Sequence, residues 1–294
     1  MKNAKRIKVV SLFAAALVGV SLLLTCCLIK APSAQVSADT EVIYYDSVYG
    51  APVGSSSTET YTIDCDYYEV KANYSYDSAP AFGNTESSFS NYCGPVTGMD
   101  IVLFNDRWKT NLIPNYEPGF THPNTGAYYY WAASTDESDA AYASIYSLMK
   151  TGEVGGTTST NFRNGLKSFV ENAGYDISYS SIYSNSKTVN LNALKTAIDQ
   201  NKVGVIMCSE YNYIMSMGVS MGDTEMTIVK ESSTIPHMMM VYGYKTYAYY
   251  KNGVNFQTDT YLYVTRSNGS GDLGYMQVND DCLDIDEAYI VTIS

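Results

Sequence analysis

Two residues of this 294-residue chain have the side chains and the sequence context for nucleophilic catalysis. Cys93 lies in Asn91-Tyr92-Cys93-Gly94-Pro95, directly before an apolar stretch. A thiol at the start of a helix meets free backbone N–H groups and the positive end of the helix dipole, which favour the thiolate. His237 precedes a short apolar run, where a strand can hold an imidazole at the edge of a cleft. The pair predicts a thiol nucleophile with an imidazole base.

The alternative for Cys93 and for His237 is a purely structural role. For the other cysteines a structural role is the stronger expectation. Cys208 ends an apolar run, where burial raises a thiol pKa, so an inert core cysteine is expected. Cys65 and Cys282 have aspartate neighbours that disfavour a thiolate, so we expect structural roles and consider a disulfide between them.

The second histidine, His122, lies in Thr121-His122-Pro123-Asn124, which has the composition of a turn. It is predicted to be an exposed loop residue. Neither histidine has a second Cys or His at ligand spacing, so the sequence predicts no metal site and no cofactor.

The first 38 residues have the features of a secretory signal. A positively charged start precedes an uncharged apolar stretch over residues 9–29, and Val36-Ser37-Ala38 offers a cleavage site of small residues. An uncleaved membrane anchor and lipid attachment at Cys26 are the alternatives. The protein is therefore expected outside the cell or at its surface.

Composition predicts a globular protein, because 46% of the residues are hydrophobic and only 16% are charged. Without residues 1–38 the chain has 13 basic and 30 acidic residues, or a net charge of −17. That charge opposes binding to nucleic acid and to anionic lipid surfaces. We expect a monomer whose partner is a peptide or protein substrate, with membrane contact only through the N-terminus.

The periodicity of the apolar residues changes along the chain. Spacings of three and four predict a helix after Cys93 with an apolar face at Val96, Met99, Val102 and Leu103, and further helices at residues 140–149, 160–172 and 191–200. Short β-type runs follow at residues 203–208, 238–244, 261–265, 275–278 and 289–293. Helices first and strands later predict an α+β protein with an antiparallel sheet.

Three segments are predicted. Residues 1–38 are the signal or anchor, and residues 39–80 are an extension that contains strands or serves as a short pro-segment. Residues 81–294 form the main domain.

The run from Asn91 to Gly98 resembles the nucleophile motif of bacterial secreted C39-like cysteine peptidases, in the papain-like superfamily. Residues 148–166, residues 191–205, and His237 with Val241-Tyr242-Gly243-Tyr244 resemble later parts of that family in the same order. The separation of 144 positions from Cys93 to His237 also suits papain-type enzymes. The resemblance, which covers about residue 81 to the end, implies a papain-like fold and a thiol protease acting through a Cys93–His237 thiolate–imidazolium pair.

Two positions depart from the family's pattern. Related peptidases usually have a Gln shortly before the nucleophile, whereas here Asn91, or Asn84 behind it, would complete the oxyanion hole. Arg266 stands where an Asp or Asn would orient the imidazole, so Asn268 is predicted to take that role, although it also suits a turn with Gly269.

The departures leave two other functions open. One is a catalytically degenerate peptidase fold that acts as a surface-binding module through its many tyrosines. The other is a cysteine-dependent acyltransferase or amidase that uses the same pair.

Overall fold

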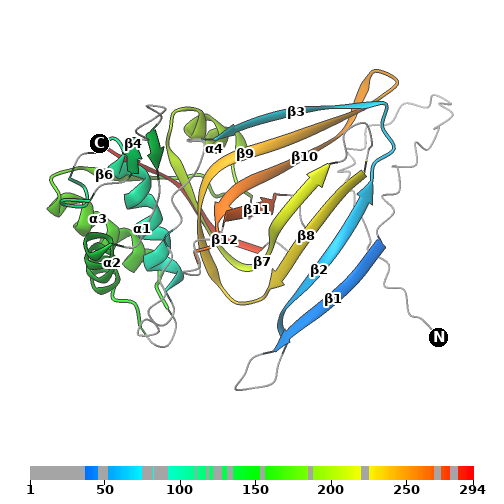
Figure 1. Ribbon diagram of the computed structural model, residues 1–294. Helices are drawn as coiled ribbons and strands as arrows, with labels where there is room; N and C mark the ends of the chain where they lie inside the picture. Colours follow the sequence, from blue (N-terminus) through cyan, green and yellow to red (C-terminus); the bar gives the residue numbers. More distant parts are fainter. Residues whose placement is uncertain are drawn as a thin grey trace, which may run out of the picture. The chain divides into compact units, whose positions relative to one another are not determined.

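The computed structural model describes residues 37–45, 52–74, 82, 92–109, 111–116, 119–121, 128–130, 135–152, 156–184, 188–219, 225–267, 273–278 and 284–294. This part of the chain contains four helices and twelve strands, an α+β architecture as predicted (Figure 1). No helix among these residues is both long and apolar enough to cross a membrane.

The helices are α1 (Cys93–Asp106), α2 (Asp136–Leu148), α3 (Ser159–Asn172) and α4 (Leu191–Asp199). The strands are β1 (Ser37–Tyr45), β2 (Pro52–Thr62), β3 (Tyr67–Tyr74), β4 (Gly119–Thr121), β5 (Tyr128–Tyr130), β6 (Ile177–Ser181), β7 (Val203–Val219), β8 (Glu225–Ser233), β9 (His237–Lys251), β10 (Val254–Thr265), β11 (Leu273–Gln277) and β12 (Asp284–Ile293).

Side-chain caps fix where the last three helices begin. Thr158 and Asn190 accept hydrogen bonds from backbone N–H groups in the first turns of α3 and α4. Thr135 and Ser138 form a reciprocal capping box, so α2 begins at Asp136, four residues before the predicted start. These caps confirm the predicted helices and correct one boundary.

The first helix differs from its predicted character. The sequence predicts an apolar face, but every residue of α1 from Gly94 to Phe104 is buried. Helices α2 and α3 pack against it, and so does strand β9 (Figure 1). A helix that is buried on all sides needs no polar face. The Cys93 backbone is therefore held by packing around the whole helix.

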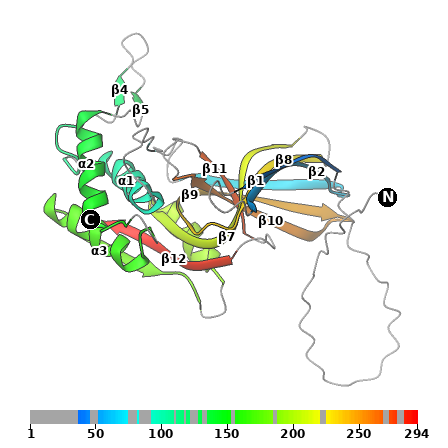
Figure 2. The same ribbon diagram turned by 90° about the horizontal axis from the view of Figure 1, so that it is seen from below.

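Ten of the strands form one antiparallel sheet, with a path β1-β2-β8-β7-β11-β10-β9-β3 and with β12 and β6 attached beside β7. β8 is absent from the predicted strands because its mixture of polar and apolar residues forms no β-type run. Residues 39–80, predicted as an extension, include β2 and β3, which pair with β8 and β9. The N-terminal strands thus lie at both ends of the path, with β1 and β2 next to β8 (Figure 2) and β3 next to β9 (Figure 1).

The long strand β7 changes partners along its length. Residues 204–208 pair with the start of β9, whereas residues from Tyr211 onward pair with β8. The change of partner lies beside His237, which is opposite Cys208 in the last β7–β9 pair. The strands therefore separate at the residue that the sequence predicts as the base.

Two cores lie on opposite sides of the β7–β9 region. Met238 and Met240 join the core under α1, α2 and α3, whereas Met239 and Val241 join a second core that includes Leu194 of α4. Side chains alternate between the faces of a strand, so β9 contributes to both.

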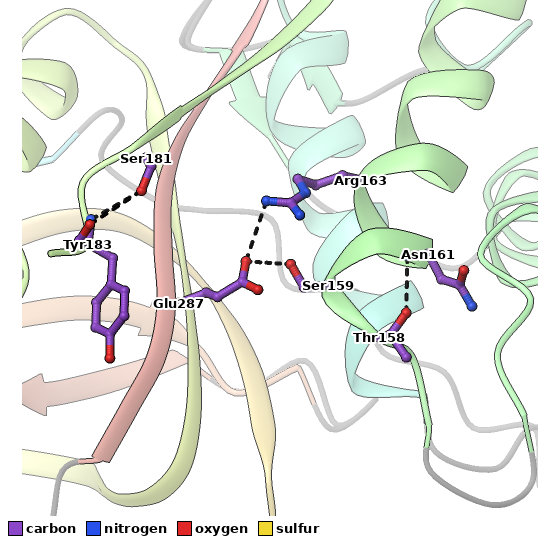
Figure 3. Close-up of polar contacts among 7 residues, drawn as sticks. All are labelled: Thr158, Ser159, Asn161, Arg163, Ser181, Tyr183 and Glu287. Atoms are coloured by element: carbon purple, nitrogen blue, oxygen red, sulfur yellow. Dashed lines mark hydrogen bonds and ion pairs between the residues drawn. The ribbon is translucent and has the colours of Figure 1, made fainter. Parts of the chain in front are cut away.

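Polar contacts fasten α3 to the sheet. Glu287 of β12 accepts a hydrogen bond from the Ser159 hydroxyl at 2.5 Å, and Arg163 lies 3.4 Å from the same oxygen (Figure 3). Thr158 caps the same helix end. These contacts hold the N-terminus of α3, and with it Thr157, at a fixed place relative to the sheet.

Candidate active site

Cys93 is the first residue of α1, as predicted. The N-cap, Tyr92, makes no side-chain hydrogen bond to the helix, and the first turn has no acidic residue. The backbone N–H of Met238, the residue that follows His237, is close enough to the Cys93 sulfur to lower the pKa of the thiol. This contact brings the start of α1 to the start of β9.

The helix start lowers the pKa of the Cys93 thiol, as predicted, but burial has a larger and opposite effect. Burial raises the pKa of the Cys93 thiol, although N–H groups of Met238, Gly94 and Cys93 itself lower it in part. Residues packed around the sulfur displace the water that would solvate a thiolate, and this loss exceeds the gain from the amide dipoles. Cys93 is therefore a neutral thiol at neutral pH.

His237 is the first residue of β9, and its Nε2 lies 2.5 Å from the carbonyl oxygen of Arg266. A carbonyl oxygen can only accept, so Nε2 carries the hydrogen and donates it. In the neutral ring, Nδ1 is then the nitrogen with a free lone pair. Burial lowers the pKa of His237, and the Arg266 charge lowers it further, although the bond to the Arg266 carbonyl raises it. The imidazole is neutral, as a base must be.

The Arg266 side chain has partners of its own. It forms an ion pair with Glu231, and its guanidinium carbon lies 5.3 Å from the centre of the Tyr213 ring. The backbone carbonyl of Arg266 therefore binds His237, whereas its guanidinium group binds Glu231 of β8. At the position where the sequence has an arginine in place of an Asp or Asn, the imidazole is thus bound by a main-chain carbonyl.

Tyr211 packs on the His237 ring. Its ring stacks on the His237 ring, with centroids 5.3 Å apart and planes inclined by 21°. Burial is the main reason that the pKa of Tyr211 is raised, and a charge on Cys93 raises it further. The sequence interpretation missed Tyr211, which is one of 29 tyrosines and lies beyond the predicted run at residues 203–208, in the part of β7 that the sequence did not predict.

A buried polar network lies behind the pair. The Thr97 hydroxyl is 3.0 Å from the Met238 carbonyl oxygen and 3.0 Å from the Ser267 hydroxyl. Ser267 is 3.3 Å from a carboxyl oxygen of Asp100. The sequence interpretation also missed these residues. Asp100 alone gave a signal, as a carboxyl group within the apolar stretch Met99-Asp100-Ile101-Val102.

The position after Cys93, which Gly94 occupies, has no room for a side chain. A Cβ atom at this position would lie 2.6 Å from Cβ of Thr157, just before α3. Thr157 itself is hydrogen-bonded to Thr151 at 2.7 Å. The start of α1 can approach α3 this closely only with glycine.

The remaining predicted residues divide into two groups. Asn91, Asn84, Asn268, His122 and Cys282 lie outside the described residues. Cys208 is buried, and burial followed by the charges of Asp286 and Asp284 raises its pKa, in agreement with a structural role. Cys65 is a half-buried free thiol, and burial and its aspartate neighbours raise its pKa.

Comparison with family models, with curated proteins and with solved structures gives no match to this chain. Within the described part, no group of three or more His, Cys, Asp or Glu side chains could hold a metal ion.

Proposed function

We propose that this protein is a secreted cysteine peptidase of papain-like arrangement, in which Cys93 is the nucleophile and His237 the base. The observation that carries the proposal is the contact between α1 and the start of β9: the Thr97 hydroxyl, one turn after Cys93, is 3.0 Å from the carbonyl oxygen of Met238, the residue that follows His237. The Met238 N–H also lowers the pKa of the Cys93 thiol. The donation from His237 Nε2 to the Arg266 carbonyl supports it, because this bond leaves Nδ1 able to accept a proton.

Because the Cys93 thiol and the His237 imidazole are both neutral, proton transfer accompanies nucleophilic attack. Nδ1 of His237 takes the thiol proton as the Cys93 sulfur attacks the peptide carbonyl carbon, so the ion pair forms during attack. The oxyanion is held by the Cys93 N–H at the helix start and by the predicted Asn91 amide. His237 then protonates the leaving amine, and water hydrolyses the thioester with His237 as base.

One observation favours the degenerate, binding-only alternative. A thiol whose pKa is raised by burial, with a base oriented by a neutral carbonyl, is poorly activated. In that case Cys93 would be a packed core cysteine. An acyltransferase or amidase would need the same reactive thiol and would differ in substrate.

A thiol-directed epoxide distinguishes these possibilities. We expect the epoxide to label Cys93 in the purified protein, as mapped by mass spectrometry, and the label to be lost in Cys93→Ala and strongly reduced in His237→Ala. His122→Ala and Cys208→Ala are the matched controls and should label normally. Equal labelling of Cys93 with and without His237 would exclude the pair.

A further inference from the structure

The polar network of Thr97, Ser267 and Asp100 connects the two segments that form the His237–Arg266 hydrogen bond. Thr97 lies one helical turn after Cys93 on α1. Its hydroxyl contacts the carbonyl of Met238, the residue after His237, and the hydroxyl of Ser267, the residue after Arg266. One side chain of the nucleophile helix therefore fixes the distance between the segment that carries the base and the segment that carries its acceptor.

Ser267 has a backbone conformation that needs support. Its φ is +51°, in the left-handed region that residues other than glycine adopt at an energetic cost. This turn directs the preceding Arg266 carbonyl, whose oxygen accepts from His237. Ser267 is buried, and its hydroxyl is also 2.9 Å from that of Thr265. The network supplies the contacts that maintain the turn.

Asp100 completes the network from the same helix. It lies about two helical turns after Cys93 and is fully buried. One carboxyl oxygen accepts from the Phe82 N–H at 2.7 Å, and the other accepts from the Ser267 hydroxyl at 3.3 Å. A buried carboxyl group without these donors would be costly, so its position is tied to that of Ser267.

We propose that Thr97, Ser267 and Asp100 are positioning residues that hold the Arg266 carbonyl against Nε2 of His237 and so fix the ring in the tautomer with Nδ1 unprotonated. The inference rests on the proposed function for its catalytic meaning. Its structural content, the tautomer, can be measured without any activity. In this arrangement the Arg266 carbonyl, held by the three residues, takes the place of the Asp or Asn side chain that would otherwise orient the base.

The test measures the tautomer and the thiol separately. Protein labelled with ¹⁵N-histidine gives ring signals from only two histidines, and His237→Ala assigns those of His237. We expect the wild-type ring to be protonated at Nε2 alone. Thr97→Val and Ser267→Ala should give a mixture of tautomers, with Cys93 alkylation about tenfold slower, as expected for loss of a buried hydrogen bond.

Two variants separate positioning from stability. Thr97→Ser keeps the hydroxyl and should restore the wild-type tautomer and alkylation rate. Thr260→Val removes another buried threonine hydroxyl, which contacts Lys195 and Thr246 away from the site, and should change neither. Thermal unfolding of all the variants shows whether each is folded.

The results distinguish this inference from the proposed function. A wild-type tautomer in both folded Thr97→Val and Ser267→Ala would overturn the positioning role, whatever the reactivity of Cys93. A shift of tautomer in these variants together with an unreactive Cys93 in the wild type would support positioning and overturn the peptidase. Protonation of Nδ1 in the wild type would overturn the inference directly.

Discussion

At the residue scale, His237 donates to a neutral carbonyl, whereas many catalytic histidines donate to a carboxylate. A neutral acceptor stabilises the imidazolium less, and burial lowers the pKa of His237 as well. Because burial also raises the pKa of the Cys93 thiol, the uncharged pair is the stable resting form. The residues would therefore function as nucleophile and general base, without a preformed ion pair.

This resting form predicts the pH dependence of alkylation by iodoacetamide. The folded pKa of Cys93 is raised above 9.0, so the thiolate population, and with it the alkylation rate, should increase up to and beyond pH 9. Mass spectrometry across about pH 6 to 10 measures this for each cysteine separately. A plateau below neutral pH would indicate a preformed thiolate and contradict the account.

The Arg266 side chain should matter little to the position of the imidazole, since the carbonyl makes the contact. Arg266→Ala keeps the carbonyl, and loss of the Glu231 ion pair should change Cys93 alkylation less than about threefold. Removal of the positive charge should raise the pKa of His237 toward its ordinary value, as measured by NMR titration. Arg163→Ala, which breaks another Arg–Glu pair, is the control. Loss of the Nε2–H tautomer in Arg266→Ala would contradict this assignment.

At the element scale, the reactivity of Cys93 depends on how closely α1 approaches α3. In Gly94→Ala the new Cβ meets Thr157 Cβ, and a short branched side chain cannot move aside. We expect a loss of about 1–3 kcal/mol in the free energy of unfolding, measured with urea, together with slower Cys93 alkylation.

Gly98→Ala is the matched control in the same helix. Its Cβ would meet Cε of Met149, the flexible end of a long side chain, and alanine also favours the helix. Its loss of stability should therefore be clearly smaller. Equal effects of the two substitutions would show that the approach of Gly94 to Thr157 is not special.

Most elements that position the site could be predicted from the sequence, because they depend on local patterns. The start of α1 at Cys93 and the start of β9 at His237 follow from apolar spacing next to these residues. The roles of Arg266 and Ser267 could not be predicted, because a main-chain carbonyl and a positive φ leave no trace in residue type. Tyr211 was missed because the second half of β7 depends on pairing with β8, which is distant in the sequence.

At the scale of the whole molecule, Asp100 links the site to stability. Burial raises the pKa of Asp100 to about 7 from an ordinary value of 3.8, against hydrogen bonds from Phe82, Thr265 and Ser267. Below about pH 4 both the folded and the unfolded state hold the proton. Between about pH 4 and pH 7 only the unfolded state releases the Asp100 proton. The free energy of unfolding therefore falls as pH rises, by at most about 4 kcal/mol.

Asp100→Asn should remove this part of the pH dependence. The free energy of unfolding, measured with urea from about pH 4 to 8, should fall less steeply than in the wild type. Asp176→Asn, an exposed substitution, should leave the slope unchanged. Parallel wild-type and Asp100→Asn curves would show that Asp100 is not the group responsible.

Cleavage of peptide bonds by Cys93 and His237 would create new peptide termini. Incubating the protein with a complex peptide pool and sequencing the products by mass spectrometry requires no knowledge of the substrate. The account predicts new termini with the wild type and Cys208→Ala, and none with Cys93→Ala or His237→Ala. Identical peptide sets from the wild type and Cys93→Ala would contradict it.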